Sequence, residues 1–155
     1  MTTEHKNARA SKEQERRSSS QEVIQKLMAE RAEMLLLYCQ IAGLDPYGKN
    51  SRGKHALDLL QKFCQVLVDY IAAGHFSLYE RVVNGTERRQ RIAGLADQLY
   101  PRIADTTEAA LDFNDKYDCG DHCQIAASFD DDLSRLGEEL ATRIELEDKL
   151  LSNFQ

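Results

Sequence analysis

Hydrophobic residues recur every three or four positions along four long stretches of the chain, the spacing that places them on one face of an α-helix. The first predicted helix covers about residues 21–42. Its apolar stripe, which Arg31 interrupts, is Ile24, Met28, Leu35, Tyr38 and Ala42. The glycines and the proline between residues 43 and 53 predict a loop after it.

The second predicted helix begins near Lys54 and extends to about Val83, ahead of the stop signal Asn84-Gly85. Gly74 lies inside it, so the sequence predicts either one bent helix or two helices that break at Ala73-Gly74. The apolar stripe of this segment is Phe63, Leu67, Ile71, Leu78 and Val82.

The third predicted helix covers about residues 87–117, and Pro101 must kink or divide it. Its stripe is Ile92, Leu95, Leu99, Ile103, Thr106, Ala110, Phe113 and Tyr117. The fourth covers about residues 121–152, with Asp121 as its N-cap. Its stripe, in which Glu147 is the polar member, is Ile125, Phe129, Leu133, Leu136, Leu140, Ile144, Leu151 and Phe154.

Four amphipathic helices with short connections predict an all-α fold, an antiparallel up-and-down four-helix bundle. Residues 1–20 carry almost no apolar side chains, which predicts a mobile polar tail in which a frayed start of the helix is possible. Residues 21–155 then form one helical-bundle domain. A length of 155 residues and a hydrophobic content of 42% suffice for a single core. With two prolines and eight glycines, the chain lacks the turn residues that an all-β fold needs.

The net charge of −6 disfavours direct binding to nucleic acid, which needs clustered Lys and Arg, and favours a basic protein partner. The chain contains neither an apolar run that could span a bilayer nor the apolar core of a signal peptide. We therefore expect a cytoplasmic protein with reduced cysteines. A phosphate-binding glycine loop, a nucleophile elbow and a paired CxxC are all lacking, which predicts a protein that is not an enzyme.

The polar face of the second predicted helix contains the first candidate site. Asp58, Lys62, Gln65 and Asp69 follow helical spacing on this face. Continued towards the C-terminus, the same stripe reaches Ala72, Ala73, Phe76 and Glu80, with Tyr79 beside them. A phenylalanine flanked by carboxylates on a solvent face is typical of an aromatic anchor for a partner, although single exposed aromatic residues are also common on protein surfaces.

Three motifs in this chain resemble the Rsd/AlgQ family of bacterial regulators, which bind the principal sigma factor of RNA polymerase. The longest is FCQVLVDYIAAGHFSLYE, residues 63–80. The others are Phe113-Asn114-Asp115, with the turn DCGD at residues 118–121, and RIELED at residues 143–148. The resemblance extends from about residue 23 to the C-terminus.

The resemblance implies an all-helical bundle that binds the C-terminal domain of the principal sigma factor, the domain that reads the −35 promoter element. Binding there would occlude the promoter and core-polymerase contacts of that domain. The resemblance also implies a role in stationary phase or in alginate regulation, without a cofactor. Whether the protein represses or activates, and whether its free form is a monomer or a weak homodimer, stays open at this point.

A row of carboxylates on the third predicted helix is the second candidate site: Asp105, Glu108, Asp112 and Asp115. Most such rows are simply solvated helix faces. Because the DNA-reading part of a sigma factor is basic, this row could also imitate promoter phosphates and increase the association rate.

Polar residues on three predicted core stripes form a third constellation: Arg31, His75 and Glu147. In an antiparallel bundle they lie near one end, close to Tyr79 and Asp148. We expect a partly buried polar network that pairs its charges, since an unpaired buried charge is costly. Its role is either structural or to line a groove that contacts the partner.

Two other classes of helical bundle are alternatives. A hemerythrin-like di-iron site needs about five histidines or Glu-x-x-His pairs, whereas this chain has four histidines and lacks that pair. A histidine phosphotransfer domain exposes its histidine, whereas His75 is predicted on the core stripe.

The cysteines give one weak candidate metal loop, formed by Cys119, His122 and Cys123. A closed zinc site needs a fourth ligand, so free cysteines in a polar turn are the better interpretation. Cys39 and Cys64 lie among apolar positions and are predicted to be small core residues.

The chain departs from the family pattern at two places. Gln25, Lys26 and Leu27 stand where the family often has Asp-Arg-Trp, and Ile144 stands where it usually has Phe. The effect of the missing tripeptide on the affinity for sigma factor is open, and so is the identity of any second partner.

Overall fold

The computed structural model describes residues 2–43, 52–75, 90–118 and 127–152, and within them the chain forms four α-helices and no β-strand. Helix α1 is Thr2–Ala42, α2 is Arg52–Gly74, α4 is Gln90–Tyr117 and α5 is Phe129–Leu151. The predicted all-α class is therefore confirmed.

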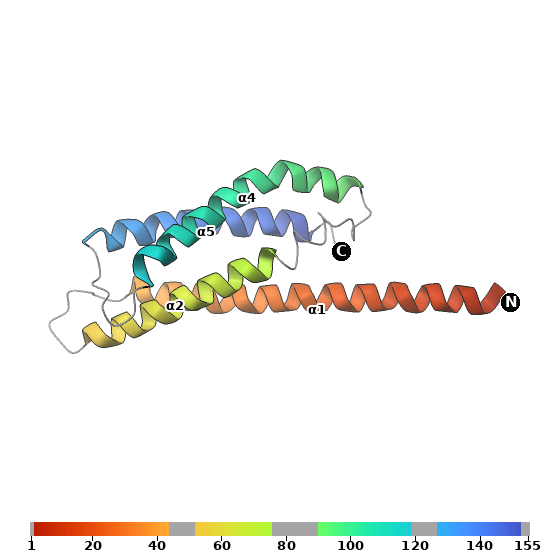
Figure 1. Ribbon diagram of the computed structural model, residues 1–155, viewed down its shortest axis with the longest axis horizontal. Helices are drawn as coiled ribbons and strands as arrows, with labels where there is room; N and C mark the ends of the chain where they lie inside the picture. The colour runs from red at the N-terminus through yellow and green to blue at the C-terminus, as the bar shows by residue number, and fades with distance from the viewer. Residues whose placement is uncertain (1, 44–51, 76–89, 119–126, 153–155) are drawn as a thin grey trace.

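The helices pack as a chain of neighbours. Helix α1 packs along α2, α2 packs against α4, and α4 packs against α5, while α1 and α5 meet at only a few positions. Successive helices run in opposite directions, and the N-terminal part of α1 extends well beyond the other three (Figure 1). The closed up-and-down four-helix arrangement stays a prediction.

The N-terminal boundary predicted for the first helix is wrong. Helix α1 begins at Thr2 rather than near Gln21, and the side chains described between residues 7 and 14 are exposed. Lys, Arg, Glu, Gln and Ala are strong helix formers even without a core to pack against, so a polar segment can extend a helix that packing has nucleated. The mobility predicted for residues 1–20 stays a prediction.

The buried stripe of α1 also differs from the prediction. The side chains that point into the core are Leu27, Met34, Leu37 and Ile41. Of the predicted residues, Ile24, Met28 and Tyr38 are only partly buried, Ala42 is exposed, and 39% of Leu35 is accessible. Residues 34–37 are all apolar, so their sequence cannot indicate which of them faces α2. Packing on the neighbouring helices decides that instead.

Helix α2 follows its predicted stripe, since Phe63, Leu67 and Ile71 are buried. Its described bounds end at Gly74, the position of the predicted break, and residues 76–83 of the predicted second helix lie outside the described residues. Leu78 and Val82 lie outside the described residues.

Helix α4 contains Pro101 without being divided, and it changes direction along its length (Figure 1). Proline has no backbone N–H to donate to the carbonyl four residues earlier, and its ring clashes with that carbonyl, so the helix bends there. The predicted stripe is buried from Ile103 to Tyr117 and partly buried at Leu95 and Leu99.

Helix α5 begins at Phe129, eight residues after the predicted start, and a turn at residues 127–128 precedes it. Asp121, Ile125 and Phe154 lie outside the described residues. Three aspartates in the first turn, Asp130 to Asp132, favour this helix start because they face the positive end of the helix dipole. Arg143 is fully buried, whereas the predicted stripe residue Ile144 is only partly buried.

Aromatic rings from all four helices form a continuous line through one half of the core. Tyr38 lies 6.1 Å from Phe63 and Phe63 lies 5.9 Å from Phe113, between ring centroids. Phe113, Tyr117 and Phe129 continue the line at 4.7 and 5.4 Å. Tilted and edge-on ring pairs at these distances are favourable, and they fix the helices relative to one another.

Candidate partner-binding surfaces and a buried polar network

The exposed polar face of α2 has the predicted composition. We call Asp58, Lys62, Gln65 and Asp69 the α2 face, and all four side chains are exposed. The Gln65 side-chain amide donates a hydrogen bond of 3.2 Å to the Asp69 carboxylate, one helical turn away. Ala72 and Ala73 continue the stripe and are partly buried. Phe76, Tyr79 and Glu80 lie outside the described residues.

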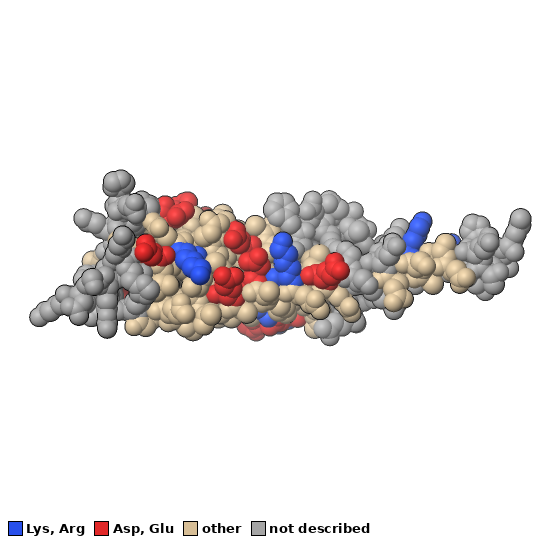
Figure 2. Space-filling view, turned by 90° about the horizontal axis from the view of Figure 1, so that it is seen from below, with Lys and Arg blue, Asp and Glu red and all other residues tan. Residues whose placement is uncertain are grey.

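Carboxylates are also prominent on the neighbouring surface. Seen from below the view of Figure 1, acidic side chains gather on the part of the molecule away from the N-terminal end of α1, with some basic side chains among them (Figure 2). Such a surface attracts a basic partner from a distance and repels nucleic acid.

The carboxylates predicted on the third helix form one continuous exposed row on α4, which we call the acidic row: Asp105, Glu108, Asp112 and Asp115. Among the residues that the structure describes, Asp105 is the one member of the row with a cation within 4 Å, the Arg102 guanidinium at 3.9 Å. The row therefore keeps most of its charge available to a partner.

The predicted meeting of polar residues on the core side is observed for Arg31, Glu147 and Asp148. The Arg31 guanidinium lies 2.8 Å from the Asp148 carboxylate and 3.7 Å from that of Glu147. The predicted core position of His75 is wrong, because its side chain is exposed at the end of α2. In its exposure His75 resembles the histidine of a phosphotransfer domain.

Glu147 is the centre of what we call the buried network, and the sequence did not reveal most of its partners. Its carboxylate accepts a hydrogen bond from the Tyr70 hydroxyl on α2 and one of 2.9 Å from the Arg143 Nε. Both Arg143 and Glu147 have 0% of their side-chain surface accessible. The network therefore holds an ion pair that is entirely removed from water.

Arg143 extends the network to α4. Its Nη1 donates to Thr107 Oγ1 at 2.7 Å and to Thr106 Oγ1 at 3.2 Å. With Arg31 from α1 and Tyr70 from α2, every described helix contributes a residue. One sequence signal could have found this pair, namely an arginine and a glutamate four residues apart next to a core stripe.

Burial dominates the electrostatics of this site. It raises the pKa of Glu147 above the usual glutamate range, although Arg143, the Tyr70 hydrogen bond and Arg31 all act to lower it. Burial likewise raises the pKa of Tyr70, and the adjacent Glu147 charge raises it further. A desolvated carboxylate of this kind remains charged only as long as its partners stay in place.

Close packing at Gly74 connects the network to the end of α2. A Cβ atom at this position would lie 3.1 Å from Arg143 Nη2 and 3.4 Å from Glu147 Oε1. Glycine therefore lets the α2 backbone approach the buried ion pair closely.

The described residues contain no cluster of His, Cys, Asp or Glu that could hold a metal ion. Cys119, His122 and Cys123 lie outside them. Cys64 is buried as predicted, but Cys39 is exposed, so its predicted core position is wrong. The described helices also include none that is long and apolar enough to cross a membrane.

Comparison with known proteins gives consistent matches over most of the chain. The family model described as "Regulator of RNA polymerase sigma(70) subunit, Rsd/AlgQ" matches residues 7–155. A "Regulator of sigma D" of Yersinia enterocolitica is 32% identical over 145 residues, which cover 88% of this chain and 83% of the relative. Proteins with the same description from Salmonella arizonae and Salmonella paratyphi B are each 34% identical, over 139 and 144 residues, and cover 88% of this chain and 84% of the relative.

Proposed function

This chain belongs to the Rsd/AlgQ family, and from this premise we propose that it is an anti-sigma regulator that binds the C-terminal domain of the principal sigma factor. The observation that supports the proposal most strongly is that the family match covers α1 from residue 7 and all of α2, α4 and α5, including the α2 face. The protein would act in the cytoplasm, where RNA polymerase is, and its mechanism requires no cofactor.

We place the main contact on the α2 face and its continuation. Asp69 is exposed, and the partly buried Ala73 leaves room for a partner to approach the helix. Phe76, Tyr79 and Glu80 follow in the sequence, outside the described residues, and Phe76 is the proposed anchor. Aromatic anchors near the centre of an interface usually carry much of its binding energy.

The acidic row on α4 contributes through its field rather than through close contact. The sigma domain that reads promoter DNA presents a basic surface, and four neighbouring carboxylates compete with DNA phosphates for it. We expect them to increase the association rate and its sensitivity to salt more than the affinity.

Occlusion is the proposed mechanism. A protein bound to the −35-reading surface excludes the promoter and the contact with core polymerase, so core enzyme becomes available to alternative sigma factors. A metal-binding or phosphotransfer function has no comparable support, since the family match points to sigma regulation.

Competition for DNA tests the occlusion step. A fluorescent duplex that carries the −35 element is bound to the C-terminal domain of the principal sigma factor, and this protein is then added while fluorescence anisotropy is measured. Occlusion predicts that the duplex is released as the protein binds. If the protein bound the domain while the anisotropy stayed high, the occlusion mechanism would be wrong.

A further inference from the structure

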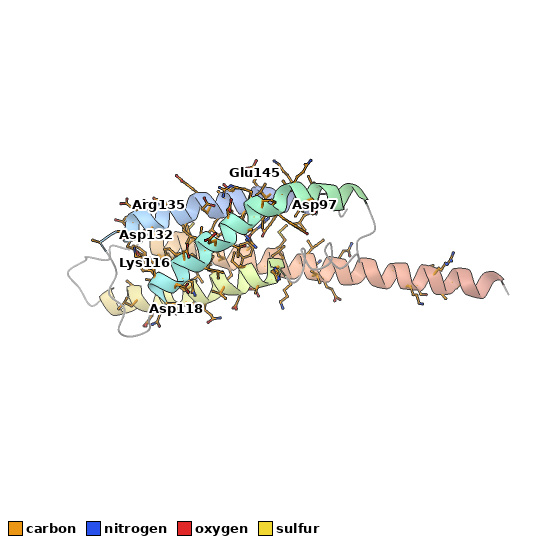
Figure 3. The ribbon with its side chains drawn as sticks, turned by 45° about the horizontal axis from the view of Figure 1, so that its top comes forward. Asp97, Lys116, Asp118, Asp132, Arg135 and Glu145 are labelled. Carbon is orange, nitrogen blue, oxygen red and sulfur yellow. The ribbon has the colours of Figure 1, made fainter. Side chains whose placement is uncertain are left out.

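The surface between α4 and α5 contains a groove of about 580 Å³ that lies outside the α2 face and includes one residue of the acidic row, Asp112. Its floor is made by Ala109, Phe113 and Leu136, and its charged rim includes Asp112, Arg135 and Glu138. Figure 3 shows Lys116, Asp132 and Arg135 gathered at one end of the α4–α5 pair.

Ion pairs between the helices close the groove at both ends. At one end the Arg102 guanidinium donates two hydrogen bonds, of 3.0 and 3.2 Å, to the Glu139 carboxylate. At the other, Lys116 Nζ lies 2.7 Å from the Asp132 carboxylate, which also accepts a hydrogen bond from Tyr117. The α4 residues that line the groove extend from Ala109 to Tyr117, eight residues apart, which corresponds to about 12 Å at 1.5 Å per helical residue.

These ion pairs neutralise the cations at the two ends but leave the middle of the groove acidic. The side chains of Asp112, Glu138 and Arg135 make no ion pair or hydrogen bond with the residues that the structure describes. The exposed carboxylates of Glu108, Asp115 and Asp131 lie nearby on the same two helices. Among the described residues, the groove thus holds two carboxylates without an ion pair and has three exposed carboxylates beside it, against one cation without an ion pair, Arg135.

This charge distribution selects the ligand. The first turn of α5, which would otherwise attract an anion, contains Asp130, Asp131 and Asp132 and therefore repels one. A groove about two helical turns long is also longer than a single small cation. We propose that the α4–α5 groove binds a second protein partner through a segment rich in lysine or arginine, separately from the proposed sigma contact on α2.

Charge supplies most of the attraction in this groove. Phe113 and Leu136 are nearly buried, so the floor offers little apolar surface, although the aliphatic stem of a lysine or arginine can lie across it. Binding through exposed carboxylates is moderate in affinity and sensitive to salt. The α5 residues Arg135 and Glu138 should act in opposite directions, because Arg135 repels a basic segment and Glu138 attracts it.

A fluorescein-labelled helical peptide of alanine, leucine and arginine serves as the probe, and anisotropy is measured with the full-length protein. At low salt, Glu138→Lys should weaken binding about fivefold or more, and Arg135→Glu should strengthen it about threefold. Neither variant changes the α2 face or the acidic row. Circular dichroism confirms that each variant folds.

Glu145→Lys is the matched control, since it makes the same change on α5 outside the groove (Figure 3). It should change the affinity less than about twofold. Equal losses with Glu138→Lys and Glu145→Lys would mean that the peptide responds only to net charge and would overturn the groove as a site. Unchanged binding by Glu138→Lys, or weaker binding by Arg135→Glu, would overturn it as well.

The same variants separate this proposal from the proposed function. Glu138→Lys and Arg135→Glu should bind the C-terminal domain of sigma factor as the wild type does, because the α2 face is intact. If they lost the sigma domain together with the peptide, the groove would belong to the sigma contact and would not be a separate site.

Discussion

Arg143 and Glu147 are the residues whose interaction matters most for the stability of this core. Their side chains have no accessible surface, and they lie one helical turn apart on α5 with an N–O distance of 2.9 Å. Desolvating two charges costs several kcal/mol per ion. Their pairing offsets that cost, together with the hydrogen bond that Tyr70 donates to Glu147 and those that Arg143 donates to Thr106 and Thr107.

This pairing predicts a non-additive pair of substitutions. Arg143→Met leaves the Glu147 carboxylate buried without its main partner and should lower the free energy of unfolding by about 3–5 kcal/mol. The double variant Arg143→Met, Glu147→Leu removes both charges and should lose less than the single variant. Urea denaturation measures both. A double variant that is less stable than the single one would contradict this account of the network.

Asp132 predicts a pH dependence at the residue scale. Hydrogen bonds from Lys116 and Tyr117 hold the pKa of Asp132 below the usual aspartate value. Because this pKa is lower in the folded than in the unfolded protein, the ionised Asp132 carboxylate stabilises the fold. This stabilisation is complete above the usual aspartate pKa of about 4, and it is lost as the pH falls through the lowered pKa.

The measurement is the difference in melting temperature between the wild type and Asp132→Asn as a function of pH. The difference should be constant from pH 7 to about 5 and should shrink below about pH 4. A difference that grew on acidification would show that the Asp132 carboxylate is not stabilised by its charge.

At the scale of elements, the contact between α1 and α5 depends on a glycine. The Tyr38 hydroxyl donates a hydrogen bond of 2.9 Å to the backbone carbonyl of Leu133. A Cβ atom on Gly137 would lie 2.9 Å from Tyr38 Cζ and still closer to the hydroxyl oxygen. A rigid ring cannot yield at this position without moving away from α5.

Gly137→Ala should therefore destabilise the protein by about 1–3 kcal/mol through overpacking, although alanine is the better helix former. Gly94→Ala in α4 is the matched control, since a Cβ there meets no atom within 4 Å among the described residues. It should stabilise the protein by about 0.5–1 kcal/mol. Thermal or urea unfolding compares the two, and equal stabilisation by both would contradict the close contact at Tyr38.

The sequence predicted the elements unequally. In α2 and α4, apolar residues recur every three or four positions with polar residues between them. The sequence therefore correctly predicted that Phe63, Leu67, Ile103 and Phe113 are buried. In α1 the run of apolar residues 34–37 fits several helix orientations, and the contact with α2 and α5 selects among them. Helix ends were predicted least well, because exposed polar residues in α1 can be helical or not at little cost in free energy.

At the scale of the whole molecule, the sequence predicted three of the polar residues that lie together in the core but not their other hydrogen-bond partners. Arg31, Glu147 and Asp148 were predicted to lie together from their level in the helices, and they do. The sequence did not predict that Tyr70, Thr107 and Arg143 belong to the buried network. Whether their side chains reach it depends on how each helix is rotated about its axis. Periodicity alone leaves that rotation uncertain by about one residue.

The most direct test of the proposed function is a calorimetric titration with the C-terminal domain of the principal sigma factor from the same organism. We predict a micromolar or tighter complex with the wild type, weakened about tenfold or more by Phe76→Ala. Glu145→Ala, which removes an exposed carboxylate from α5 rather than from the α2 face or the acidic row, should leave the affinity within about twofold. Absence of binding by the wild type, or equal affinity of the Phe76→Ala variant, would contradict the proposal that this chain regulates sigma factor through α2.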